Sequence, residues 1–104
     1  MDFDGIELHF DKGIWVGMTA TKYGLMELVL DGTKDAPKEG HVVAVRRFLA
    51  GLEEAVAKMR QNIPWGFLYR PIRIAPNNED RVGIQFRHRL TGYQGHLILE
   101  DKRV

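Results

Sequence analysis

Two residue types that carry much of protein chemistry are absent from this chain of 104 residues, which has no cysteine and no serine. Without cysteine there is no disulfide, thiol nucleophile, zinc ribbon or iron–sulfur site, and the absence fits a reducing compartment. A serine or cysteine catalytic triad is excluded by composition. No apolar run approaches the roughly 18–20 residues of a membrane-spanning helix, and the acidic N-terminus lacks the basic start of a secretory signal. We therefore expect a cytoplasmic protein with no membrane association.

Motifs for metals, cofactors and acid–base catalysis are missing as well. The four histidines include no helical i, i+4 pair and no HExxH motif, and the eleven glycines form no phosphate-binding pattern. Neighbouring carboxylates point to different sides of a helix or strand, so they cannot act as one acid–base pair. This holds for Glu53–Glu54, Glu79–Asp80 and Glu100–Asp101. The sequence predicts no metal site, no cofactor and no enzymatic activity.

What the chain does contain is typical of one globular domain covering residues 1–104. Hydrophobic residues make up 44% and charged residues 28% of the sequence. The net charge is +1, but it is distributed unevenly. Residues 1–40 carry eight acids against four lysines, whereas residues 41–104 carry eleven basic residues against six acids. This imbalance either cancels within the fold or gives the C-terminal strands a basic face.

Alternating hydrophobicity predicts three N-terminal strands at 6–10, 14–21 and 25–31, joined by short glycine-containing turns into an antiparallel meander. The second strand has one aliphatic face, which begins at Ile14 and which we expect to point to the core. Its other face begins at Trp15, so we expect that tryptophan to be exposed and available for contacts.

A helix is the clearest signal in the sequence. Apolar residues recur every three or four positions from Val42 to Met59. Asp35 is the expected N-cap, and Asn62 and Pro64 are expected to end the helix. The apolar stripe is shorter than three heptads, which favours packing on a sheet over a coiled coil.

Three further strands are predicted at 66–75, 81–90 and 96–100. Pro71 lacks a backbone donor, so we expect an edge position or a bulge there. Trp65, at the exit of the helix, is expected to close the edge of the core. The order βββαβββ predicts an α+β fold with an antiparallel sheet of about six strands and one helix on one face.

The uncovered face of that sheet is the candidate contact surface. Arginines beside exposed aromatics suit phosphates, bases or carboxylates of a partner, although a solvated strand face is the alternative. In the strand 81–90, Arg87 and Arg89 are expected to point the same way, about 7 Å apart. The candidate partner-binding residues are His9, Trp15, Tyr69, Arg73, Gln85, Arg87 and Arg89.

Three groups of residues carry a family resemblance. They are Trp15 and Gly17 in an early strand, the strand Leu28–Leu30 ending at Gly32, and the helix residues Val45, Phe48, Leu49 and Leu52. Residues 14–59 thereby resemble small bacterial domains of unknown function, some of which are encoded beside toxin genes as presumed immunity proteins. The resemblance implies a protein that binds and blocks a partner toxin.

Three hypotheses follow. The first is a non-enzymatic protein-binding domain, in concrete form a bacterial immunity or inhibitor protein, acting through the uncovered sheet face or the acidic first hairpin. The second is a nucleic-acid-associated accessory protein using Arg73, Arg87 and Arg89, which the net charge of +1 disfavours. The third is a homo-oligomer in which the sheet face packs on a second copy through Trp15.

Overall fold

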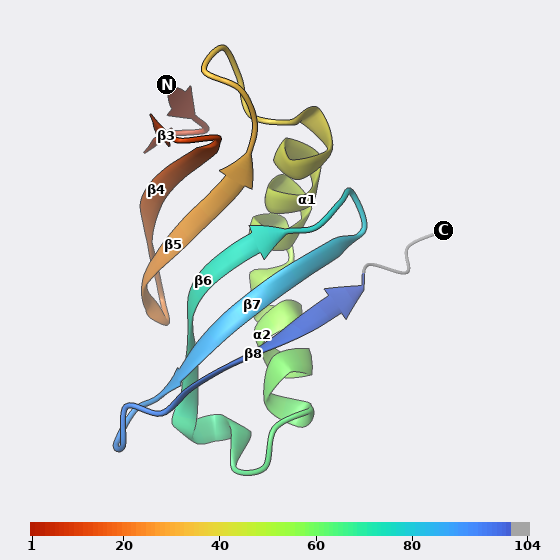
Figure 1. The fold of residues 1–104 in the computed structure, drawn as a ribbon. Coiled ribbons are helices and arrows are strands. Elements are labelled where there is room, and N and C mark those ends of the chain that lie inside the picture. Colours follow the sequence, from red (N-terminus) through yellow and green to blue (C-terminus); the bar gives the residue numbers. More distant parts are fainter. Residues whose placement is uncertain (101–104) are drawn as a thin grey trace.

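The computed structural model describes residues 1–100 and has an α+β architecture, as predicted (Figure 1). The strands are β1 (Asp2–Phe3), β2 (Ile6–Glu7), β3 (His9–Asp11), β4 (Ile14–Thr21), β5 (Gly24–Asp31), β6 (Tyr69–Pro76), β7 (Arg81–His88) and β8 (Gln94–Glu100). The helices are α1 (Glu39–Ala50), α2 (Leu52–Gln61) and the short 3₁₀ helix η1 (Gly66–Leu68). Neither α1 nor α2 has the length and apolar character that crossing a bilayer requires.

The main sheet has six strands in the order β3-β4-β5-β6-β7-β8. Neighbouring strands are antiparallel except β5 and β6, which run parallel because the chain crosses between them through α1 and α2. Both helices lie across one face of the sheet (Figure 1). The opposite face is not covered by any helix among residues 1–100.

The predicted helix is present but broken. Its apolar stripe is confirmed, with Val45, Val56 and Met59 almost fully buried. At Gly51 the backbone leaves the helical region, with φ −109° and ψ 33°, so two helices replace the single one expected. The predicted N-cap at Asp35 is wrong. The Gly32–Pro37 bridge holds that segment in a loop, and α1 begins only at Glu39.

An N-terminal hairpin, β1–β2, packs on the same face as the helices. Phe3 and Leu8 are buried there, which interrupts the strand predicted over residues 6–10. The hairpin crosses β4 at Gly17, where a Cβ atom would lie 2.6 Å from both the Glu7 carbonyl oxygen and Leu8 Cδ2. Position 17 therefore requires a glycine, and the side of β4 on which its Cβ would stand must face the hairpin.

This crossing sets the phase of the whole of β4, because successive side chains of a strand alternate between faces. Trp15 shares the covered face with Gly17 and is only 7% exposed, while Met18 on the other face is 52% exposed. The Trp15 ring lies opposite Leu30, and its Nε1 donates a hydrogen bond to the Thr33 carbonyl oxygen at 2.8 Å. The prediction that Trp15 is exposed is wrong.

Pro71 marks a bulge, not an edge. β6 lies inside the sheet, and its register with β7 shifts between Pro71 and Arg73. One extra residue inverts the alternation of the strand at this point. As a result Pro71 is buried on the covered face, whereas Arg73 points to the uncovered face.

The other tryptophan also differs from the expectation. Trp65 is 72% exposed and adopts a left-handed conformation with φ 59°. Its neighbour Gly66 is the residue that packs inward, since a Cβ atom there would lie 2.0 Å from the Arg60 carbonyl oxygen. This close approach of two backbones turns the Trp65 side chain outward, so it does not close the core.

Candidate partner-binding surface

The uncovered face of the sheet has more apolar side chains than the sequence predicted, because β4 presents its aliphatic side there. Met18, Leu25 and Ile98 are exposed by 52%, 60% and 55%. The face is built from residues that alternate with the buried ones on five strands. They are Ile14, Val16, Met18, Ala20, Leu25, Glu27, Val29, Arg70, Arg73, Ala75, Gly83, Gln85, Arg87, Gln94, His96, Ile98 and Glu100.

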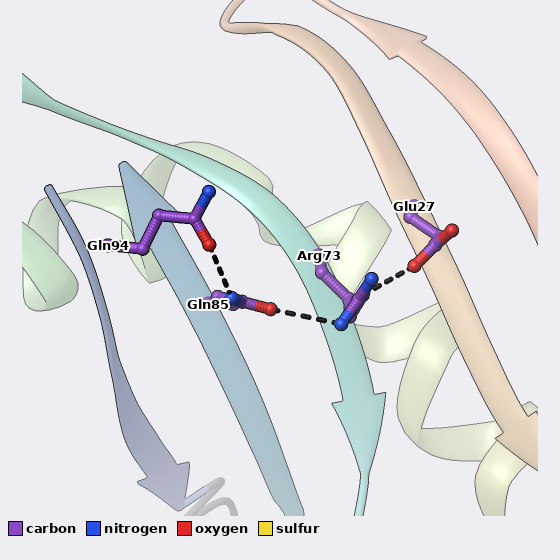
Figure 2. A network of polar contacts seen from close by, with 4 residues as sticks. All are labelled: Glu27, Arg73, Gln85 and Gln94. Carbon is purple, nitrogen blue, oxygen red and sulfur yellow. Dashed lines mark hydrogen bonds and ion pairs between the residues drawn. The ribbon is translucent and has the colours of Figure 1, made fainter. Parts of the chain in front are cut away.

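A row of polar side chains crosses this face from β5 to β8 (Figure 2). Arg73 forms an ion pair with Glu27 through Nε and donates from Nη1 to Gln85 Oε1 at 3.2 Å. Gln85 in turn donates from Nε2 to Gln94 Oε1 at 2.9 Å. The sheet register produces this polar row, since Glu27 is the partner of Arg73, and Arg73 is the partner of Gln85. The contacts link four side chains of neighbouring strands on an exposed surface.

An open hollow of about 260 Å³ lies beside the polar row. The surface is depressed here because Ala75 has a small side chain and Gly83 has none. Arg73, Gln85 and Ile98 border it, together with Asn77 and His96. The hollow offers an apolar floor with hydrogen-bonding groups at its border, which suits a protruding side chain of a partner.

The structure brings together some of the predicted contact residues. Arg73 and Gln85 are members of the polar row, and Arg87 lies on the same face between Arg70 and Gln94. His9 is exposed on β3, at the far edge of the sheet, and takes no part in the row. Of the candidate contact residues, Arg73, Gln85 and Arg87 therefore lie together on the uncovered face, and their role in binding stays a prediction.

Other predicted contact residues point elsewhere. Trp15 is buried on the covered face of the sheet, as described above. Tyr69 lies on the covered side of the bulge, where its ring packs edge-on against Phe86 and His88 at centroid distances of 5.2 and 5.0 Å. β7 ends at His88, and the backbone N–H of Arg89 donates to Leu68 in a loop. The predicted side-by-side placement of Arg87 and Arg89 on one strand is therefore wrong.

The sequence reasoning missed Glu27 and Gln94, the two ends of the polar row. Glu27 alternates with the buried Met26 and Leu28, so its exposure could have been inferred, but its partner depends on the parallel pairing of β5 and β6. A second exposed group was also missed at the exit of α2 and in the β7–β8 loop. It comprises Trp65, Phe67, Leu90 and Tyr93.

The ion pairs that shift side-chain pKa values lie away from the uncovered face. The hydrogen bond from Arg46 lowers the pKa of Asp4, and the hydrogen bond from Lys22 lowers the pKa of Glu53. Asp4 belongs to the acidic first hairpin, and its pairing with Arg46 at 2.9 Å reduces the negative charge that this hairpin offers a partner. Within residues 1–100, no group of three histidine or acidic side chains is arranged to hold a metal ion.

Comparison with known proteins found no matching family model, no matching curated protein and no matching solved structure.

Proposed function

We propose that this protein is a non-enzymatic protein-binding domain and that its contact surface is the uncovered face of the six-stranded sheet. The observation that supports this most directly is the polar row of Glu27, Arg73, Gln85 and Gln94 beside exposed apolar side chains. Ordering long side chains at an interface costs about 0.5–1.5 kcal/mol each. Side chains already held by hydrogen bonds avoid most of that cost, which makes this face suited to binding.

The chemistry of the face indicates what a partner should present. An apolar side chain fits the hollow over Ala75 and Gly83, and hydrogen-bonding groups beside it can meet Gln85 and Gln94. The guanidinium of Arg73 is already paired with a carboxylate, so this face offers less positive charge to nucleic acid than the sequence suggested. These features favour a protein partner.

The specific form of the proposal is an inhibitor of a bacterial partner protein such as a toxin. In this form the uncovered face covers part of the partner and blocks its activity. The acidic hairpin is the less suitable contact surface, because Asp4 pairs with Arg46 and Glu7 pairs with the N-terminal amine. A partner that binds through the hairpin would have to displace these contacts.

Site-specific photo-crosslinking tests the proposal in cells that produce the protein. A photoreactive residue is placed at Met18 or Ile98 on the uncovered face, and at Ala57 on the exposed side of α2 as a matched control. We expect one protein to be captured from Met18 and Ile98 and not from Ala57. The substitution Arg73→Glu, which breaks the polar row, should abolish that capture while the circular dichroism spectrum is retained.

Two results would contradict the proposal. Equal capture from Ala57 would mean that the uncovered face has no special role. Binding of oligonucleotides at low salt, with a steep loss as salt rises and a complete loss in Arg87→Ala, would favour the nucleic-acid hypothesis. A protein contact with an apolar centre should depend far less on salt.

A further inference from the structure

β8 is the one long edge strand of the six-stranded sheet among residues 1–100. All seven of its residues pair with β7 without a register shift, and no second strand pairs with it in the described part of the chain. The other edge, β3, has only three residues. Natural edge strands are usually protected by proline, lysine or a bulge, and β8 has none of these within Gln94–Glu100.

The hydrogen-bonding pattern shows which backbone groups of β8 face outward. His88 donates its backbone N–H to the Tyr93 carbonyl oxygen at 2.7 Å, so these two residues form a hydrogen-bonded pair. Hydrogen-bonded and non-hydrogen-bonded pairs alternate along an antiparallel ladder. Four residues beyond Tyr93, Leu97 is therefore again in a hydrogen-bonded pair, with Ile84 of β7. His96 and Ile98 therefore direct their N–H and C=O groups to the open side of the strand.

An antiparallel pairing of β8 with itself satisfies these groups. When a two-fold axis passes beside Leu97, all seven residues find partners in the second copy. His96 then pairs with Ile98 of the second copy, and Gln94 pairs with Glu100. The two Leu97 residues face each other in a non-hydrogen-bonded pair, in which Cα atoms lie about 4.5 Å apart.

Charge favours a second copy of this chain over an unrelated strand. One end of the β7–β8 ladder carries Glu79, Asp80 and Glu100, of which Glu100 is paired with Arg81 at 3.1 Å. The other end carries Arg87 and, in the following loop, Arg89. An antiparallel two-fold arrangement sets the acidic end of each copy beside the basic end of the other.

The covered side of β8 also carries two partly exposed leucines, Leu97 and Leu99, which a second copy would bury further. A cleft of about 310 Å³ separates the helices from β7 and β8. Its lining mixes apolar side chains such as Phe48 and Leu99 with charged ones such as Arg47, Glu54 and Glu100. We propose that the protein forms a two-fold dimer in which two β8 strands pair and join the two sheets into one. The proposal uses the edge of the sheet, so it does not depend on the binding role of its uncovered face.

Sedimentation equilibrium from about 1 µM to about 500 µM tests the dimer, since weak association dissociates within this range. We expect a mass that rises with concentration from 11.9 kDa toward twice that value. His96→Pro removes an outward N–H without breaking a bond to β7, and Gly95 before it accommodates a proline. This variant should stay folded and monomeric, whereas His96→Ala, which keeps the N–H, should still form dimers.

A cysteine probe tests the register, because the chain has no cysteine of its own. Leu97→Cys places two thiols beside the two-fold axis and should form a disulfide-linked dimer under mild oxidation. Leu99→Cys is the control, on the same face of the same strand. It places the two thiols about 13 Å apart and should form no disulfide. A mass of 11.9 kDa at every concentration would overturn the proposal. Dimers that survive His96→Pro, or equal cross-linking of the two cysteine variants, would overturn pairing through this edge.

Discussion

The two tryptophans should respond to mutation in opposite ways. Trp15 is 7% exposed, packs near Phe10 at a centroid distance of 5.3 Å and donates to the Thr33 carbonyl oxygen. Truncating a buried tryptophan to alanine costs about 3–5 kcal/mol, so Trp15→Ala should remove a large part of the 5–15 kcal/mol typical of a small domain. Trp65 is 72% exposed, and Trp65→Ala should change the free energy of unfolding by less than about 1 kcal/mol.

Urea unfolding of both variants measures these costs directly. Trp15→Phe separates the two contributions of the buried ring, because it keeps most of the apolar contact and loses the hydrogen bond, which is worth about 0.5–1.5 kcal/mol. Acrylamide quenching gives an independent check, with the Trp15 emission protected and the Trp65 emission accessible. If Trp15→Ala costs less than about 1 kcal/mol, the assignment of Trp15 to the covered face of β4 is refuted.

Three further predictions concern a close backbone contact, a buried hydrogen bond and a surface ion pair. Gly17→Ala should cost about 1–3 kcal/mol in urea unfolding, because its Cβ would overlap Leu8 and the hairpin backbone. His41→Leu should cost about 1–3 kcal/mol in the same assay, because the buried Nδ1 accepts a backbone N–H at 3.0 Å that would lose its partner. Arg46→Ala should raise the pKa of Asp4 toward its ordinary value, as followed by NMR titration. Since Arg46 lowers that pKa, the pair stabilises the fold above the carboxyl range, and this contribution disappears as the pH falls through the lowered pKa.

The α+β class and the central helix could be predicted because both depend on local periodicity. The apolar stripe from Val42 to Met59 has a helical period that no other element shares, and it is buried as expected. The antiparallel meander of β4 and β5 likewise follows from two alternating segments and a short turn at Gly24. Local periodicity therefore predicts these elements correctly, but not the helix boundaries, since Asp35 is not the N-cap and Gly51 divides the helix into α1 and α2.

The errors arise where distant segments determine the structure. Trp15 and Ile14 begin two faces of β4 that are both apolar enough to be buried. The choice between them depends on the hairpin that crosses at Gly17. At Pro71 the sequence leaves an edge position or a bulge open, and the place of β6 between β5 and β7 decides for the bulge that points Arg73 to the uncovered face. At each place, a shift of one residue in the alternation decides which side chains lie on the uncovered face.

The polar row links the two proposed surfaces at a single residue. Gln94 ends the row on the uncovered face and also begins the edge strand, where the two-fold pairing places it opposite Glu100 of the second copy. Pairing of two β8 strands would therefore bring the two polar rows to the same seam, each ending at a glutamine beside a carboxylate. A partner that spans the seam would contact hollows from both copies, and its affinity would then exceed that of a single face. Dimerisation and partner binding, although tested by different variants, are thus expected to reinforce each other.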